Sequence, residues 1–389
     1  MQYLPMVITF MCAVLLVAAC TDAPQNASSS DVEMRGIWLT NVDSDVLDSR
    51  EGIDEAMAFL AEHNFNTVFP VVWHNGSTLY PSTVMDTTFS HPMHPEYENR
   101  DPLAEVIEAA HRHDMAVIPW FEFGFSADND PDGPGHILQK RPEWAARDTS
   151  GAILKKNGFR WMNAYHPEVQ DFIRALVREV AETYDIEGIQ GDDRLPAQPV
   201  EGGYADYTQE RYQKAHNGAS PPPDPHDEDW KRWRASLLND FAEDLYAGVK
   251  AIDSSLYVSW SPSVYPWSYN EYLQDWPSWI EGDYADVVHP QVYRRDSTDY
   301  RTTLQSLHPD SIGVSPAAQE IIYPGVLIKA GDYVIDADVF IESLKTNRQL
   351  GYEGEVLFFY EGLRANNDTL ADTLRATLYS DPAQSPLRP

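Results

Sequence analysis

Strand-like stretches alternate regularly with amphipathic helical stretches along the chain from residue 32 onward, and this alternation constrains the fold more than any other feature. Apolar residues dominate the strand-like runs, and the segments between them repeat apolar residues at helical spacing. Eight such β/α units predict an α/β fold, a TIM (β/α)8 barrel in one large domain with loop insertions. The predicted strands are residues 35–40, 67–73, 116–123, 186–191, 257–261, 286–293, 312–315 and 355–360, and predicted helices include 53–63, 103–113, 230–252 and 339–350.

An open, doubly wound sheet is the alternative fold for the same alternation. Such sheets commonly carry a glycine-rich phosphate loop after the first strand. Here Asn41 and further polar residues follow that strand instead. A proline-rich stretch at 218–229 is interpreted as a surface insertion, because the strand and helix patterns continue on both sides of it.

The first 19 residues have the length and composition of a signal peptide, ending in Val17-Ala18-Ala19-Cys20. This ending resembles a bacterial lipobox, which predicts that Cys20 is acylated after cleavage and that residues 20–31 form a flexible tether to a membrane. The predicted location is therefore the cell envelope, at the periplasmic face of the outer membrane or the cell surface. An ordinary secretory signal is the alternative. The second cysteine, Cys12, lies in the removed segment, so no disulfide is expected.

Acidic residues outnumber basic ones by 61 to 28, which gives a formal net charge of -33. A surface of this charge repels phosphate backbones, so no nucleic-acid partner is expected. The composition also suggests a chain that stays soluble at high salt. No His, Asp or Glu set has a recognised metal-ligand spacing, so neither metal nor cofactor is expected, and the single domain is expected to be a monomer.

Carboxylates follow several of the predicted strands. Asp192 and Asp193 stand at the end of the fourth, Glu122 lies in an aromatic run in the third, and Glu361 follows the eighth. Acids at the carboxyl ends of barrel strands are what a glycosidase needs, and an apolar setting raises a carboxyl pKa toward that of a general acid. The structural alternatives are a capping role or pairing with an arginine, Arg194 for the aspartates and Arg35 for Glu122. A seventh-strand acid, Glu320, is a weaker candidate.

The other strand ends supply aromatic, amide and imidazole groups. Aromatic faces stack on the apolar faces of sugar rings, and amides and imidazoles bond sugar hydroxyls. Each aromatic residue has an alternative role in the barrel core. The candidate substrate-binding residues are Trp38, Asn41, Trp73, His74, Asn75, Trp120, Gln190, His289, Gln291 and Tyr293.

Five stretches, at residues 34–41, 118–125, 161–169, 188–193 and 291–293, resemble the glycosyl-hydrolase-like family ten. The similarity runs in order through the chain after the tether. It implies a secreted or lipid-anchored barrel glycosidase, and some members of that family cleave peptidoglycan strands stripped of their peptides. Gly191 is a departure, because the residue before the two acids is commonly aromatic in the family, and a glycine there implies a wider pocket.

The sequence therefore predicts a lipid-anchored glycoside hydrolase of a β-linked, amino-sugar-containing polysaccharide, with cell-wall glycan as first choice. The alternatives are a non-catalytic glycan-binding barrel and a hydrolase or transglycosylase of another exopolysaccharide. If Glu122 works with the acid pair from the adjacent strand, a short separation of roughly 5 to 5.5 Å and retention of configuration are expected. If Glu361 does so across the barrel mouth, roughly 6.5 to 9.5 Å and inversion are expected.

Overall fold

A computed structural model describes residue 1 and residues 32–388 of the chain. The predicted signal segment, Cys20 and the tether lie outside the described residues. Within the described part, no helix combines the length and apolar character needed to cross a membrane.

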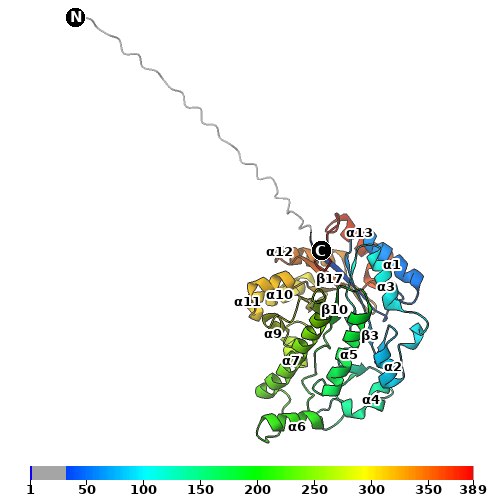
Figure 1. Cartoon of the computed structure of the whole chain (residues 1–389). Helices are drawn as coiled ribbons and strands as arrows, with labels where there is room; N and C mark the ends of the chain where they lie inside the picture. Colours follow the sequence, from blue (N-terminus) through cyan, green and yellow to red (C-terminus); the bar gives the residue numbers. More distant parts are fainter. Residues whose placement is uncertain (2–31, 389) are drawn as a thin grey trace. The chain divides into compact units, whose positions relative to one another are not determined.

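Residues 32–388 form a closed barrel of parallel strands, so the predicted (β/α)8 fold is confirmed (Figure 1). Two strands are each divided into two short pieces, at Pro119 and Pro290, because proline has no backbone N–H to give to the ladder. Isolated parallel bridges, Val71 with Trp120 and Val288 with Ile322, continue the pairing across these breaks. In barrel order the strands are β1 (Met34–Leu39), β2 (Thr67–Pro70), β5 and β6 (Ala116–Val117, Trp120–Phe121), β10 (Gly188–Gly191), β11 (Tyr257–Trp260), β12 and β13 (Val287–Val288, Gln291–Val292), β14 (Gly325–Leu327) and β17 (Gly354–Phe358), which pairs with β1.

Helices cover the outside of the barrel. The one before β10 shows how the sequence specifies them, since Pro167 occupies its first turn and its apolar residues at helical spacing, such as Phe172 and Leu176, are buried. The covering helices are α1 (Arg50–Glu62), α3 (Pro102–His111), α5 (Pro167–Thr183), α7 (Glu228–Ile252), α9 (Trp276–Glu281), α10 (Ser297–Ser306), α12 (Ala337–Gln349) and α13 (Glu361–Ala376).

Long insertions follow the carboxyl ends of several strands. In Figure 1 the small helices α2, α4 and α6 gather at the end of the barrel away from the C-terminus. The inserted and connecting elements are α2 (Thr83–Phe89), α4 (His136–Lys140), α6 (Asp206–Ala215), α8 (Trp267–Tyr272), α11 (Pro309–Ile312), the 3-10 helices Pro95–Tyr97, Pro142–Trp144 and Pro316–Ile321, and the strands β3 (Trp73–His74), β4 (Ser77–Thr78), β7 (Ser126–Asp128), β8 (Lys155–Lys156), β9 (Phe159–Trp161), β15 (Lys329–Ala330) and β16 (Tyr333–Val334).

The prediction of a seventh strand at residues 312–315 is wrong. Ile312 ends α11 and Val314 is buried in the turn after it, so their apolar character serves helix packing. The true strand is β14, which is only three residues long and begins at Gly325, where the turn-like pair Pro324-Gly325 interrupts the apolar run of residues 321–328. Gln319 and Glu320 consequently lie in the 3-10 helix before β14 and not at the mouth, and Glu320 is exposed.

The C-terminal segment closes the amino-terminal end of the barrel. Asn66 donates a hydrogen bond to the carbonyl of Ala383 at 3.0 Å, and the hydroxyls of Thr67 and Ser385 lie 2.8 Å apart. The guanidinium of Arg388 bonds the carbonyl of Met115 at 3.0 Å. This end is therefore sealed by backbone and side-chain contacts, and the opposite, carboxyl end is the one left to the insertions.

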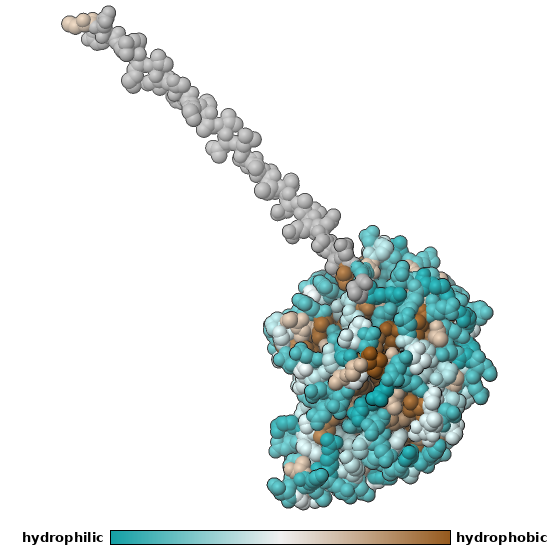
Figure 2. Space-filling view, in the orientation of Figure 1, coloured by the Kyte–Doolittle hydropathy of each residue, from teal (hydrophilic) through white to brown (hydrophobic). Residues whose placement is uncertain are grey.

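Most of the face drawn in Figure 2 is hydrophilic, with apolar patches confined to hollows between polar rims. This matches a composition with 61 acidic and 28 basic residues. The apolar residues needed for the barrel are buried instead, as the fully buried Ile37, Val68 and Ile189 show.

Candidate active site

Three carboxylates and one arginine meet at the carboxyl end of the barrel. Glu122 follows β6, and Asp192, Asp193 and Arg194 follow the adjacent β10. The guanidinium Nη2 lies 3.2 Å from Glu122 Oε1 and 3.1 Å from Asp192 Oδ2, and Nη1 lies 3.6 Å from Asp193 Oδ1. We call these four residues the acid cluster. The one positive charge of Arg194 cannot balance three ionised carboxylates, so the cluster favours the binding of a proton to one of them.

Asp192 is the most enclosed member of the acid cluster, with a side chain only 3% exposed. Its Oδ1 accepts hydrogen bonds from Ser261 Oγ at 3.1 Å and from Gln291 Nε2 at 2.8 Å. Its Oδ2 accepts from Arg194. Every one of these partners donates to Asp192, which is the arrangement that suits an ionised carboxylate.

Glu122 has the opposite environment. Its Oε1 pairs with Arg194, but its Oε2 is buried and has no hydrogen-bond partner among the described residues. The nearest imidazole, His74 Nε2, is 3.9 Å from Oε2. Burial is the main cause that raises the pKa of Glu122 from 4.5 to about 7, with Arg194 opposing the shift and Asp193 adding to it. Burial also lowers the pKa of His74 to about 3, so His74 is neutral at pH 7.

Burial and the neighbouring carboxylates of Asp193 and Glu122 also raise the pKa of Asp192, against the attraction of Arg194. The proton shared by the cluster still fits best on Glu122. A protonated carboxyl needs an oxygen that is free to carry the hydrogen, and Glu122 Oε2 is free whereas both oxygens of Asp192 accept hydrogen bonds. The arrangement therefore offers a proton donor and ionised carboxylates side by side, as glycosidic cleavage requires.

Glu355, on β17, provides a structural comparison within the same chain. It is fully buried, yet both oxygens are paired: Oε1 accepts from Tyr379 at 2.7 Å, and Oε2 accepts from Asn347 at 2.8 Å and Arg348 at 3.0 Å. A buried carboxylate that only supports the fold is thus completely satisfied, in line with the general cost of unpaired buried charge. Glu122 is not satisfied in this way, which favours a role toward a ligand.

Four of the predicted substrate-binding residues surround the acid cluster or lie next to it. His74 faces Glu122, and Gln291 holds Asp192. Tyr293 stacks on Phe358 with ring centroids 5.1 Å apart, and its pKa is raised by burial and then by the charges of Asp192, Asp193 and Glu122. Trp120 lies on β6, two residues before Glu122, and its indole N–H is buried without a hydrogen-bond partner among residues 32–388.

The remaining predicted residues lie elsewhere. Trp38 donates to Gln190 at 2.7 Å inside the barrel, and the fully buried His289 packs against Trp38 and holds the carbonyl of Tyr323 at 3.1 Å. These three residues form the floor beneath the mouth. Three more lie in the insertions and loops at its edge. Trp73, on β3, donates to the carbonyl of Gly124 and packs on Phe172 of α5, and Asn75 accepts from the backbone of Asn129 in a turn. The Oδ1 of Asn41, just after β1, is buried and has no hydrogen-bond partner in the part of the chain that the structure describes.

Glu361 is the first residue of α13, and its Oε1 accepts a hydrogen bond from Ser44 at 2.9 Å. Within residues 32–388 it makes no hydrogen bond or ion pair with the acid cluster. The geometry therefore groups Glu122, and not Glu361, with the two aspartates.

Sequence reasoning missed several residues that shape the cluster. Arg194 was weighed only as a structural partner, and Ser261 and Gln274 were not identified, although Gln274 Nε2 donates to the carbonyl of Asp192 at 3.0 Å. Asn157, in the turn after β8, likewise donates to the hydroxyl of Tyr272 at 2.8 Å. The position of Arg194 directly after the two acids was the only local signal for any of them.

The glycine before the acids does not widen the pocket. A Cβ on Gly191 would lie 2.5 Å from the ring of Trp260 and 2.6 Å from the carbonyl oxygen of Leu195. The buried Trp260 thus occupies the space that a side chain at position 191 would need, and a larger residue there would displace it.

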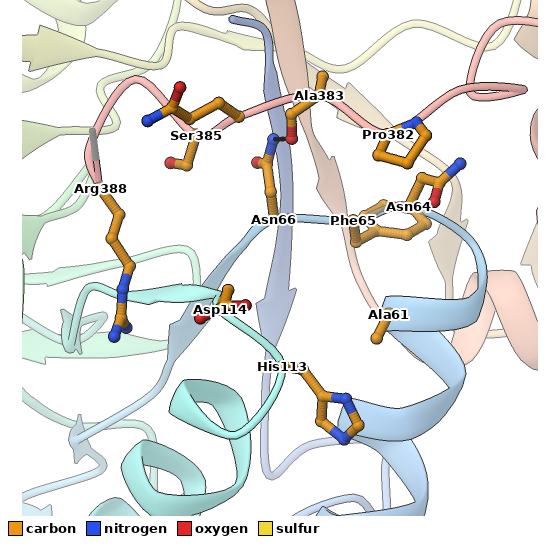
Figure 3. A pocket seen from close by; sticks show the side chains of 11 residues that line it. Ala61, Asn64, Phe65, Asn66, His113, Asp114, Pro382, Ala383, Ser385 and Arg388 are labelled. Atoms are coloured by element: carbon orange, nitrogen blue, oxygen red, sulfur yellow. Dashed lines mark hydrogen bonds between the residues drawn. The ribbon is translucent and has the colours of Figure 1, made fainter.

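A separate cavity of about 540 Å³ lies at the other end of the barrel (Figure 3). It is lined by the turns around Asn64 and Asp114 and by the C-terminal segment from Pro382 to Arg388. No member of the acid cluster contributes to it. In the described part of the chain no three His, Cys, Asp or Glu residues are placed to hold a metal ion.

The raised pKa of Glu122 predicts a pH-dependent effect on stability. The folded state binds this proton more tightly than the unfolded state, so the contribution is present below pH 4.5 and is lost as pH rises through about 7. Glu122→Gln mimics the protonated form. We expect it to match the wild type near pH 5 and to exceed it by about 2 to 3 kcal/mol at pH 8, measured by urea denaturation at both pH values.

Glu355→Gln is the matched control for this experiment. Because both of its oxygens are paired, its replacement should destabilise the protein by about 3 kcal/mol at either pH. A Glu122→Gln variant that loses stability at pH 8 as Glu355→Gln does would show that Glu122 is an ordinary structural ion pair.

Comparisons with known proteins identify the family. The family described as Glycosyl hydrolase-like 10 matches residues 33–332. Glycosyl hydrolase DigH of Escherichia coli (strain K12) is 24% identical over 313 residues, covering 69% of this chain and 67% of the relative. Glycosyl hydrolase YngK of Bacillus subtilis (strain 168) is 22% identical, covering 98% of this chain and 79% of the relative.

Solved structures show the same fold at low sequence identity. The glycoside hydrolase domain of PgaB (BpsB) from Bordetella bronchiseptica has a TM-score of 0.64 and 14% identity, covering 88% of this chain and 99% of that chain. The catalytic domain of β-amylase from Paenibacillus polymyxa has a TM-score of 0.63 and 12% identity, covering 91% and 99%. With its barrel and its family match over residues 33–332, the chain belongs to the glycosyl hydrolase-like 10 family and is a glycoside hydrolase.

Proposed function

We propose that this glycoside hydrolase cleaves a β-linked polysaccharide containing amino sugars, with peptide-free peptidoglycan strands as its substrate. The observation that carries the proposal is the acid cluster, in which Arg194 binds Glu122, Asp192 and Asp193 while Glu122 Oε2 remains unpaired. The family resemblance of the strand-end motifs supports the choice of cell-wall glycan.

Glu122 is the general acid in this proposal. Its proton passes from the carboxyl to the glycosidic oxygen as the bond to the anomeric carbon breaks, and the raised pKa keeps part of the population protonated near pH 7. The neutral His74 beside it adds no positive charge that would drive the proton off.

Asp193 is the attacking carboxylate. Its side chain is 27% exposed and its Oδ1 has no hydrogen-bond partner among the described residues, whereas Asp192 is 3% exposed and fully bonded. Asp192 then positions Arg194 and balances its charge. Because Glu122 and Asp193 come from adjacent strand ends and bind one guanidinium, we expect the short carboxyl separation of roughly 5 to 5.5 Å and net retention.

Carboxyl variants separate these roles. Glu122→Gln should lose about 10²- to 10⁴-fold in turnover, and Asp193→Asn should lose at least as much while the melting temperature stays nearly constant. Asp192→Asn should lower turnover and stability together, because it disrupts a buried network.

Glu361→Gln is the control, and its turnover should remain within a small factor of the wild-type turnover. Full loss in Glu361→Gln with activity kept in Glu122→Gln would reverse the assignment, and proton NMR of the first anomer released would then be expected to show inversion.

The substrate is tested by mass spectrometry of products from intact peptidoglycan, peptide-free peptidoglycan glycan, chitin-like oligomers and neutral polysaccharides. We expect oligosaccharides from the peptide-free glycan and little product from the intact polymer, since stem peptides crowd the strand. Glu122→Gln serves as the inactive control. Products from neutral polysaccharides alone would replace the cell-wall assignment with another exopolysaccharide.

We also propose that the enzyme is a lipid-anchored monomer of the bacterial cell envelope, on the strength of the Val17-Ala18-Ala19-Cys20 sequence. Cys20→Ser should release into the soluble fraction all protein that has lost residues 1–19, and fractionation after a high-salt wash, with mass spectrometry to separate processed from unprocessed chains, measures this on the processed form. Ala19→Gly, which keeps a small residue before the cysteine, is the control. Complete membrane retention of Cys20→Ser would contradict the anchor.

A further inference from the structure

Trp267 is the most exposed tryptophan in the chain, with 46% of its surface open to solvent. The other tryptophans are buried or partly buried. Exposing a large aromatic ring to water is unfavourable, and tryptophan is enriched at binding interfaces, where part of the ring is apolar and part is wet. The surroundings of Trp267 show which ligand fits.

Trp267 begins α8, in the loop that follows β11 at the carboxyl end of the barrel. Its ring packs against that of Tyr272, with centroids 5.4 Å apart and planes at 50°. Tyr272 in turn belongs to the loop that carries Gln274, whose side chain donates to the carbonyl of Asp192 at 3.0 Å, and the charges of Asp193 and Arg194 act on its buried phenol. The exposed ring of Trp267 therefore rests on the buried ring of Tyr272, in a loop that contacts the acid cluster.

The loop that carries Trp267 is fixed to the acid cluster. The buried Ser268 donates from Oγ to the carbonyl of Gln274 at 3.0 Å, and the Gln274 backbone N–H returns a bond to the Ser268 carbonyl at 3.2 Å. The side chain of Gln274 then donates to the carbonyl of Asp192 at 3.0 Å. Asn157 also holds the hydroxyl of Tyr272 at 2.8 Å. Trp267 is thus held in place before any ligand binds, which lowers the entropic cost of binding.

We propose that the open face of Trp267 is a sugar-binding subsite, on which a pyranose ring of the glycan chain stacks beside the sugar being cleaved. The inference rests on the proposed function, and it adds a subsite outside the set of strand-end residues. Stacking on an indole uses the apolar face of the sugar and is compatible with chains of repeating sugars. The occupant is a glycan ring because the loop that carries Trp267 contacts the acids that act on glycans.

Binding to a non-cleaving protein tests the subsite independently of turnover. Peptide-free peptidoglycan fragments and chitin-like oligomers are titrated into Glu122→Gln by calorimetry, with intrinsic tryptophan emission followed in parallel. Adding Trp267→Ala should weaken binding about fivefold to tenfold and abolish most of the emission change. Trp267→Phe should restore most of the affinity. In the catalytically intact protein, Trp267→Ala should raise KM with kcat nearly unchanged.

Tyr207→Ala is the matched control, because Tyr207 is another exposed aromatic residue but lies on α6 against His166. Added to Glu122→Gln, Tyr207→Ala should leave the affinity for the glycan fragments unchanged. Unchanged glycan binding in Trp267→Ala would overturn the subsite while leaving the proposed function intact. A loss of self-association without a loss of glycan binding would show that Trp267 contacts a second copy. If Glu122→Gln binds neither glycan, the substrate proposal and the subsite both fail.

Discussion

The candidate active site depends on one guanidinium that pairs with three carboxyl groups. Arg194 joins Glu122 on one strand end to Asp192 and Asp193 on the next, and rests against the aromatic rings of Phe123 and Phe159 at 5.3 and 4.9 Å. Without that positive charge, three carboxylates in a partly dry site would repel one another strongly. With it, the site holds the Glu122 carboxyl, which keeps a proton near neutral pH, next to the fully hydrogen-bonded carboxylate of Asp192.

The barrel supplies the geometry that this interaction needs. Adjacent parallel strands bring Glu122 and the two aspartates to the carboxyl end of the barrel. Gln291, on β13, donates a hydrogen bond to Asp192 there. The opposite end is sealed by the C-terminal segment, so the insertions and the exposed Trp267 are concentrated where the acids lie. Stability and function are thereby separated at the two ends of the barrel, as is general for this fold.

Seven of the eight strands could be predicted because their apolar runs stand out, and β14 could not because the turn-like pair Pro324-Gly325 interrupts its run. The acids could be identified because they directly follow strands. The role of Arg194 could not, since it depends on side chains converging from two strands. Sequence position also cannot tell a floor residue such as His289 from one at the mouth such as His74, because both belong to barrel strands or the turns that follow them.

The central claim is that burial, against the opposing charge of Arg194, leaves Glu122 as the protonated member of the cluster. Carbon-13 NMR of the side-chain carboxyls, with the Glu122 signal assigned by its absence in Glu122→Gln, measures this directly. The account predicts a Glu122 titration near pH 7, moving higher when Arg194 is replaced by methionine, since the guanidinium lowers this pKa. A Glu122 carboxyl that titrates near its ordinary value of 4.5, with or without Arg194, would contradict it.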